Sequence, residues 1–201
     1  MTPPLDRQTI LEEARRLFAR YGFRKTSLAD IVRGLGVGKT ALYHHFPGGK
    51  AEIVDSCLQQ EEESLLSEMR AAVDSHTDPR HQLRAMVTAK IEHIAALRRL
   101  LTAGSEVGRE LGSLSRDHER RFHLFEEGMI ETILRRGQDM AIFRPVNPQR
   151  LARALATMLG QLEIEIAFDH EAVEAREHLD TIFELVFHGL VRDEHREGRT
   201  A

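Results

Sequence analysis

Residues 26–50 read TSLADIVRGLGVGKTALYHHFPGGK, a pattern of two short helices joined by a glycine turn and followed at once by a third helix. Thr26 and Ser27 are residue types that cap the starts of helices. The apolar residues after them recur at helical spacing and predict one buried stripe, made of Leu28, Ile31, Val32 and Leu35. Gly36 allows the tight turn that follows. A chain with this pattern can place one helix in a groove of DNA.

The second of these helices has few apolar residues to bury. Val37 and Leu42 are the positions that can pack it against the first helix. The other side chains suit phosphates and base edges, so we expect them to face DNA: Lys39, Thr40, Tyr43, His44 and His45.

Charge is distributed unevenly along the 201 residues. Residues 1–50 contain nine Lys and Arg against four Asp and Glu, a formal charge of +5, whereas residues 51–201 carry −9. Phosphate binding depends on the local density of Lys and Arg, because counterions are released locally. The basic N-terminal segment is therefore the candidate DNA-facing part of an acidic protein.

The N-terminal segment resembles the signature of the TetR family of transcriptional regulators, G-V-S-x-x-x-L-Y-x-H/Y-F-x-x-K. The resemblance is dense over about the first 55 residues and rests on Thr26, Ile31, Gly36, Val37, Lys39, Leu42, Tyr43, His44, Phe46, Pro47 and Lys50. Gly34 and Gly38 stand where Ala and Ser are commoner, so we expect the first helix to fray early and a phosphate-binding hydroxyl to be missing. An additional Gly lengthens the turn of residues 47–50, as in a subset of the family that has F-P-G-G-K.

The resemblance implies an all-α protein with two domains. Residues 1–50 would form a three-helix helix-turn-helix DNA-binding domain, and residues 51–201 an effector-binding and dimerisation domain. It implies a homodimer that binds a palindromic double-stranded DNA operator and responds to a small-molecule effector. A cytoplasmic location is expected from the sequence itself, which has no membrane-spanning run and no signal-peptide pattern. Repression, rather than activation, follows from the habit of the family alone.

The resemblance also implies roles for single residues. Tyr43 and Lys50 would contact phosphates, and Thr26 would cap its helix and offer a backbone amide to a phosphate. Ser27 belongs to the same DNA-facing set. Groove contacts are expected from Lys39, Thr40 and His44, while His45 could either join them or pack sideways.

The string GVGKT at residues 36–40 also looks like a phosphate-binding P-loop. That loop needs a glycine where Arg33 stands, and it follows a β-strand, whereas residues 27–35 are predicted as an amphipathic helix. The sequence therefore argues against nucleotide binding.

The remaining sequence predicts helices throughout. The expected core face of the first helix is Ile10, Ala14, Leu17 and Tyr21. Further helices are expected near residues 49–73, 79–101 after Asp78, 116–136, from Asn147 to a turn at residues 169–170, and 172–192. A tail from Glu194 reads as disordered.

No apolar run approaches the ~20 residues that span a membrane, and the N-terminus lacks the pattern of a signal peptide. The single Cys57 lies on an apolar stripe and reads as a buried side chain.

The last two helices carry more apolar residues than one face can hold. A second copy that packs as a four-helix bundle would bury the excess, as the resemblance also implies. The alternative is that both helices are central in a monomer. The expected interface consists of Leu155, Leu159, Leu162, Ile182, Val186, Phe187 and Leu190.

Two charged residues interrupt the apolar stripes of the C-terminal region. Lys90 and Glu165 either line a ligand cavity and set its polarity, or reach solvent or a structural ion partner, because an unpaired charge there is costly. Phe122, Phe125 and Met129 are pocket candidates under the first interpretation and plain core under the second.

Other functional classes have weaker support. The 11 His residues show no metal-binding spacing, so we expect no metal and no cofactor. No nucleophile, base and orienting group form an enzyme motif. A helical protein-interaction module without effector response would explain the apolar helices but would leave the basic N-terminal segment unexplained.

Overall fold

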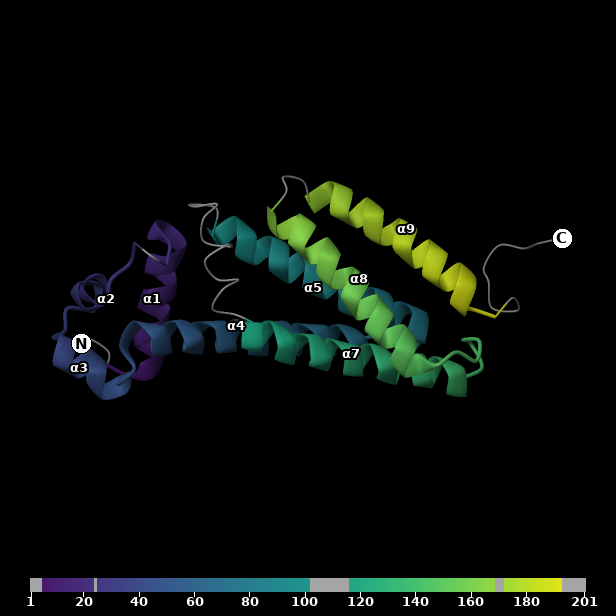
Figure 1. Ribbon diagram of the computed structural model, residues 1–201, viewed down its shortest axis with the longest axis horizontal. Coiled ribbons are helices and arrows are strands. Elements are labelled where there is room, and N and C mark those ends of the chain that lie inside the picture. Colours follow the sequence, from purple (N-terminus) through teal and green to yellow (C-terminus); the bar gives the residue numbers. More distant parts are fainter. Residues whose placement is uncertain (1–4, 24, 102–115, 169–171, 193–201) are drawn as a thin grey trace. The chain divides into compact units, whose positions relative to one another are not determined.

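The computed structural model describes residues 5–23, 25–101, 116–168 and 172–192, with the side chains of 97–101, 116–119, 161–168 and 172–177 left out of the description. These residues are almost entirely helical, which confirms the all-α class (Figure 1). The helices are α1 (Arg7–Tyr21), α2 (Leu28–Leu35), α3 (Lys39–His45), α4 (Gly49–Asp74), α5 (Pro79–Leu101), α7 (Arg116–Asp139), α8 (Pro148–Phe168) and α9 (Ala172–Leu190).

The chain divides into two compact units. The first comprises Met1–Ser64 and Ala96–His118, and the second comprises Leu65–Ala95 and Glu119–Ala201. Helices α4, α5 and α7 therefore contribute residues to both units. The domain boundary expected after residue 50 stays a prediction, because the division into compact units falls within α4.

The first unit is built around α1. Asp6 caps this helix by accepting a hydrogen bond from the Thr9 amide at 2.7 Å. The buried core of the unit consists of Ile10, Leu11, Ala14, Leu17, Phe18, Ile31, Val32, Leu42, Phe46, Ile53, Val54 and Cys57. Tyr21, expected in this core, is instead exposed, because the chain turns away at Gly22 (φ 82°) and the Phe18 ring packs on Phe23.

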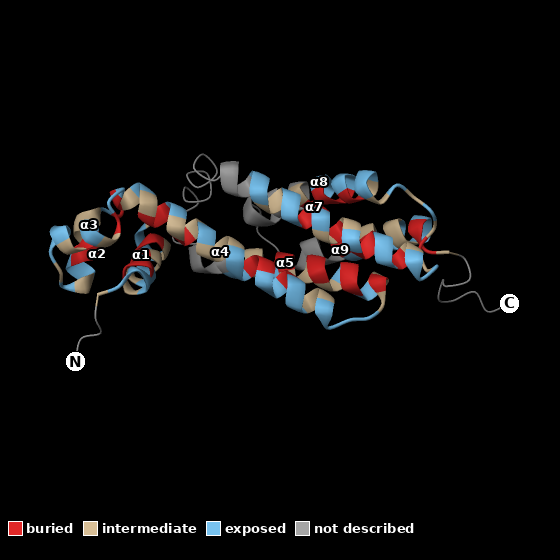
Figure 2. Ribbon diagram, turned by 90° about the horizontal axis from the view of Figure 1, so that it is seen from below, coloured by how far each residue is buried: buried red, intermediate tan, exposed pale blue. Residues whose placement is uncertain are grey.

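The second unit buries one face of each of its helices, at steps of three and four residues along α5 and α7 (Figure 2). The predicted N-caps of α5 and α8 are confirmed: the Arg80 amide donates to Asp78 at 2.8 Å, and the Arg150 amide donates to Asn147 at 2.9 Å. Gln82 is buried and donates to the carbonyls of Val73 and His76, which closes the α4–α5 turn. No helix among the described residues is long and apolar enough to cross a membrane.

The end of α9 is joined to the α7–α8 connection by a short antiparallel contact between Phe143 and Val191. The Arg144 amide donates to the Leu190 carbonyl at 2.8 Å, and the Arg192 amide donates to the Ile142 carbonyl at 3.0 Å. Phe143 is fully buried in the core of this unit.

Candidate functional site

Helix α2 starts with a complete capping box. Ser27 accepts a hydrogen bond from the Asp30 amide, and the Asp30 carboxylate accepts one from the Ser27 amide at 2.9 Å. The hydrogen bonds from the Ser27 hydroxyl and amide lower the pKa of Asp30 below its usual value. Ser27 is exposed at the start of α2, in a place that a DNA phosphate could reach.

Thr26 does not cap α2, so that part of the prediction was wrong. Its side chain is only 1% exposed, and its hydroxyl donates to the Gly22 carbonyl at 2.8 Å and lies 3.3 Å from the Leu17 carbonyl. Its amide also donates to Gly22, at 3.2 Å. Thr26 therefore ties the start of α2 to the end of α1, and the amide expected at a phosphate already has a partner.

The turn between α2 and α3 depends on Gly36. Gly36 has φ 68°, a left-handed conformation that glycine adopts without strain. The expectation that α2 frays early was wrong: α2 continues through Gly34 to Leu35, and the Val37 amide closes its end on the Val32 carbonyl at 3.0 Å. Gly38 precedes α3 and supplies no side-chain hydrogen bond to it, as expected from the missing hydroxyl.

Helix α3 presents the predicted side chains together. Leu42 and Phe46 are fully buried and anchor the helix to the first unit. Lys39, Thr40, Tyr43 and His44 are exposed on the same seven-residue helix. His45 is half-buried, and its ring contacts that of His44 edge to face with centroids 5.5 Å apart. The geometry of α2 and α3 is that of a helix-turn-helix in which the polar side chains of the second helix are exposed.

Lys50 lies beside this surface but is held locally. Its Nζ lies 4.3 Å from the centre of the Phe23 ring, in a cation–π contact at the start of α4. Gly49 before it has φ 63°, and a side chain there would meet the Tyr43 ring. The phosphate contact expected of Lys50 stays a prediction.

Two contacts of Arg7 near the C-terminal end of α3 were not predicted from the sequence. Arg7, at the start of α1, donates to the His45 carbonyl and to the Glu52 carboxylate on α4. No local pattern reveals such partners, because they are 38 and 45 residues apart in the chain.

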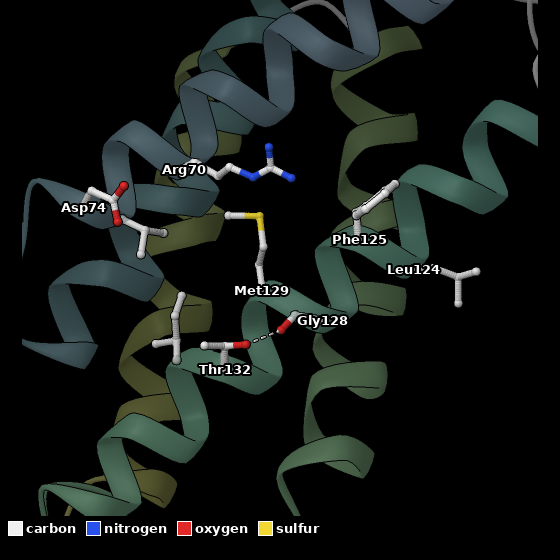
Figure 3. A pocket seen from close by; sticks show the side chains of 9 residues that line it. Arg70, Asp74, Leu124, Phe125, Gly128, Met129 and Thr132 are labelled. Carbon is white, nitrogen blue, oxygen red and sulfur yellow. Dashed lines mark hydrogen bonds between the residues drawn. The ribbon is translucent and has the colours of Figure 1, made fainter.

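In the second unit a groove of about 460 Å³ lies between α4 and α7 (Figure 3). Arg70 and Asp74 come from α4, and Met129 and Thr132 from α7; the groove is lined by Arg70, Val73, Asp74, Leu124, Phe125, Gly128, Met129, Thr132 and Ile133. Two predicted pocket residues, Phe125 and Met129, are among them, and Phe125 is too exposed to be plain core. Phe122 is half-buried and packs against the core of the unit instead.

Lys90 is paired and inaccessible. Its Nζ lies 2.7 Å from the Glu126 carboxylate and 4.9 Å from the centre of the Phe122 ring, and both charged residues are 1% exposed. This confirms the structural ion pair and excludes a side chain that reaches solvent. Lys90 does not line the α4–α7 groove. Glu165 lies outside the described side chains.

The expected interface residues are used mainly by their own unit. Leu155, Leu159 and Leu190 are buried in its core, while Ile182, Val186 and Phe187 are half-buried against it. Leu162 lies outside the described side chains. On the solvent-facing sides of α8 and α9, Met158 is 37% exposed and Leu185 is 71% exposed. Leu155, Leu159 and Leu190 are thus covered within one chain, and the predicted dimer interface stays a prediction.

The described residues contain no group of three metal-ligating side chains. Cys57 is buried in the first unit, as expected, and burial raises the pKa of its thiol to about 11.

These features define the class of protein as an all-α helix-turn-helix protein. Residues 10–57 match the family model described as bacterial regulatory proteins, tetR family. The HTH-type transcriptional repressor KstR2 of Mycobacterium tuberculosis is 38% identical over 88 residues, which is 44% of this chain and 44% of that protein. The chain thus spans less than half the length of the curated relatives that it matches. The N-terminal part of the chain is therefore similar to that of TetR-family transcriptional regulators.

Solved structures extend the likeness of the fold over the whole chain. The TetR family regulator PfmR of Thermus thermophilus is 29% identical, with a TM-score of 0.60 over 91% of this chain and 99% of that one. SmeT, the repressor of a multidrug efflux pump of Stenotrophomonas maltophilia, is 22% identical, with a TM-score of 0.73 over 100% of this chain and 97% of that one. These likenesses show the helical C-terminal fold.

Proposed function

We propose that the protein is a ligand-responsive transcriptional repressor that binds a palindromic DNA operator as a homodimer in the cytoplasm. The observation that carries this proposal is the exposed side of α3, where Lys39, Thr40, Tyr43 and His44 gather on a helix anchored by two fully buried residues. The basic charge of residues 1–50 supports it, since phosphate contacts dominate affinity for DNA. Repression is supported by the names of two relatives, KstR2 and SmeT.

The contacts divide into those that position the protein and those that read sequence. Lys39, Thr40 and His44 are exposed along α3 and are assigned to the base edges of the major groove. Tyr43 and Lys50 are assigned to phosphates, together with the exposed start of α2 at Ser27. His45 is assigned a supporting role, since its ring already packs on that of His44.

The second unit is proposed to sense a small molecule and to pair with a second copy. The α4–α7 groove is lined mainly by apolar residues, with Arg70 and Asp74 at its polar side (Figure 3). It suits a largely apolar effector, and α4, which starts four residues after α3, would transmit its binding to the DNA-reading helix. The two DNA-binding domains of the dimer, spaced by ~34 Å, would then read the two halves of one operator.

A salt titration tests the DNA-binding part of this proposal. Affinity for random duplex and for the DNA that flanks the gene is measured against salt concentration, and we expect a steep negative slope. Lys50→Ala should weaken binding to all sequences and flatten the slope by about one unit, whereas Lys39→Ala should change the preferred sequence. Absence of any salt-dependent binding would favour the alternative, a helical protein-interaction module without effector response.

A further inference from the structure

We propose that Arg7 and Glu52 form a clamp that sets the orientation of α3, and that they are positioning residues for sequence discrimination. The inference rests on the proposed DNA binding. It concerns residues outside the helix-turn-helix signature, on the first turn of α1 and the first turn of α4.

Helix α3 needs support from outside itself. It has seven residues, and Gly38 gives its N-terminus no side-chain hydrogen bond. Helices this short are marginal in water, so tertiary contacts must fix their position. The buried Leu42 and Phe46 hold one side of α3, and polar contacts are made at its C-terminal end as well.

Arg7 supplies those contacts at the C-terminal end of α3. Its Nη1 donates to the His45 carbonyl, and its guanidinium lies 4.0 Å from the centre of the Phe46 ring. Its Nη2 lies 3.4 Å from the Ser56 hydroxyl on α4. A cation at a helix C-terminus also interacts favourably with the helix dipole. One side chain of α1 thus contacts both the last residue of α3 and α4.

Glu52 closes the arrangement from α4. One carboxylate oxygen lies 3.0 Å from Arg7 Nη1, and the other accepts a hydrogen bond from the Gly48 amide at 2.9 Å. These two partners, Gly48 first, hold the pKa of Glu52 below its usual value, so the carboxylate is charged at neutral pH. The turn after α3 and the guanidinium at its end are therefore held by the same acid.

The exposure of Arg7 and Glu52 indicates that their pairing affects the position of α3 more than the stability of the fold. The side chains of Arg7 and Glu52 are 50% and 31% exposed, and exposed ion pairs contribute little to folding. Both lie at the end of the helix that is proposed to read DNA. Their loss should therefore leave the domain folded and change how α3 meets the bases.

Glu52→Gln is the decisive variant, because electrostatics alone and positioning predict opposite results. Removal of an acid near DNA should strengthen binding if charge is all that matters. If the clamp positions α3, binding to the operator should weaken about fivefold while binding to random duplex is unchanged or stronger, so the specificity ratio falls. Glutamine keeps an oxygen for the Gly48 amide, which confines the change to the Arg7 pairing.

Two matched variants complete the experiment. Glu63→Gln removes one acid from an exposed position further along α4 and should leave the specificity ratio unchanged. Arg7→Lys keeps the positive charge but cannot bridge the same partners, so it should lower the ratio as Glu52→Gln does. Thermal unfolding and circular dichroism confirm that each variant is folded.

The outcomes distinguish the clamp from the proposed function. If the wild-type protein discriminates the operator and Glu52→Gln discriminates it equally well, the clamp is overturned while the proposed function stands. If Arg7→Lys is as selective as the wild type, the clamp is overturned as well. If the wild-type protein binds no duplex in a salt-dependent way, the proposed function fails, and the positioning role fails with it.

Discussion

Lys90 and Glu126 form a charged pair in the middle of the apolar core of the second unit. Both residues are 1% exposed, and their charged atoms lie 2.7 Å apart. Such a pair is weak evidence for stability as a whole, because the cost of burying both charges offsets much of their attraction. Removal of one partner is different, since it leaves the other buried and uncompensated.

We therefore expect Lys90→Met to lower the free energy of unfolding by about 3–5 kcal/mol, because the Glu126 carboxylate loses its partner. Urea denaturation measures the loss. The double variant Lys90→Met with Glu126→Leu should recover most of it, since no charge is then buried. A single variant as stable as the wild type would show that the pair is solvated in solution.

The acid that closes the capping box of α2 makes this helix sensitive to low pH. Asp30 has a lowered pKa, first because the Ser27 hydroxyl and amide donate to it. Its stabilising contribution is present above the unfolded pKa, 3.8, and is lost as the pH falls through the lower folded value. Asp30→Asn should reduce stability at pH 7 and flatten the decline toward pH 3, measured by urea denaturation at each pH. An unchanged decline would assign the acid sensitivity to other groups.

At the scale of single helices, α7 contains two glycines with opposite surroundings. A Cβ at Gly137 would lie 2.0 Å from the ring of the buried Phe143, whereas a Cβ at Gly128 would meet nothing within 4 Å. Alanine normally stabilises a helix interior relative to glycine by about 0.5–1 kcal/mol. The same substitution should therefore have opposite signs at the two positions.

We expect Gly128→Ala to raise the free energy of unfolding by about 0.5–1 kcal/mol. Gly137→Ala should lower it by about 1–3 kcal/mol, because the Phe143 ring is enclosed and must shift. Thermal and urea unfolding of the two variants compare them directly. Equal effects would mean that the close approach of α7 to Phe143 is absent in solution.

The helices and their caps could be predicted because the signals are local. Asp78 before Pro79, Asn147 before Pro148 and Ser27 each determine a helix start within a few residues. The faces of α7 were harder: Phe125 is largely exposed and Glu126 is buried, the reverse of what their hydropathy indicates. Only the partner on α5, 36 residues away, makes a buried glutamate acceptable.

The candidate site also contains residues that could be predicted from local sequence and residues that could not. The exposed residues of α3 follow from the signature, whereas Arg7 and Glu52 could not be found, because their contacts with α3 and with each other depend on tertiary packing. Thr26 was misassigned because a threonine beside a capping serine offers the same local signal. Only the approach of α1 shows which of the two is buried.

At the scale of the whole molecule, the proposed dimer requires a surface that one chain leaves uncovered. Leu185 on α9 is 71% exposed, whereas Leu155 on α8 is buried in the core. If the C-terminal helices pair with a second copy, Leu185→Glu should give a folded monomer, because a charge would enter the interface without disturbing the core. Sedimentation velocity measures the change in mass.

A matched pair of controls makes that result interpretable. Leu155→Glu should unfold the second unit instead of dissociating it, and this loss is visible by circular dichroism. Leu124→Glu, on another exposed apolar residue, this one of α7, should leave the sedimentation unchanged. If Leu185→Glu remains dimeric, the interface lies on another surface.

The hydrogen-bonded contact between Phe143 and Val191 decides how far the polypeptide can be trimmed. A fragment that stops at Gly189 would lose the Leu190 carbonyl that accepts from Arg144 and the Arg192 amide that donates to Ile142, along with the buried side chains of Leu190 and Val191. The aromatic ring underneath would then be open to water. The shortest stable form of the protein should therefore extend past the last turn of α9, to include the contact with Phe143.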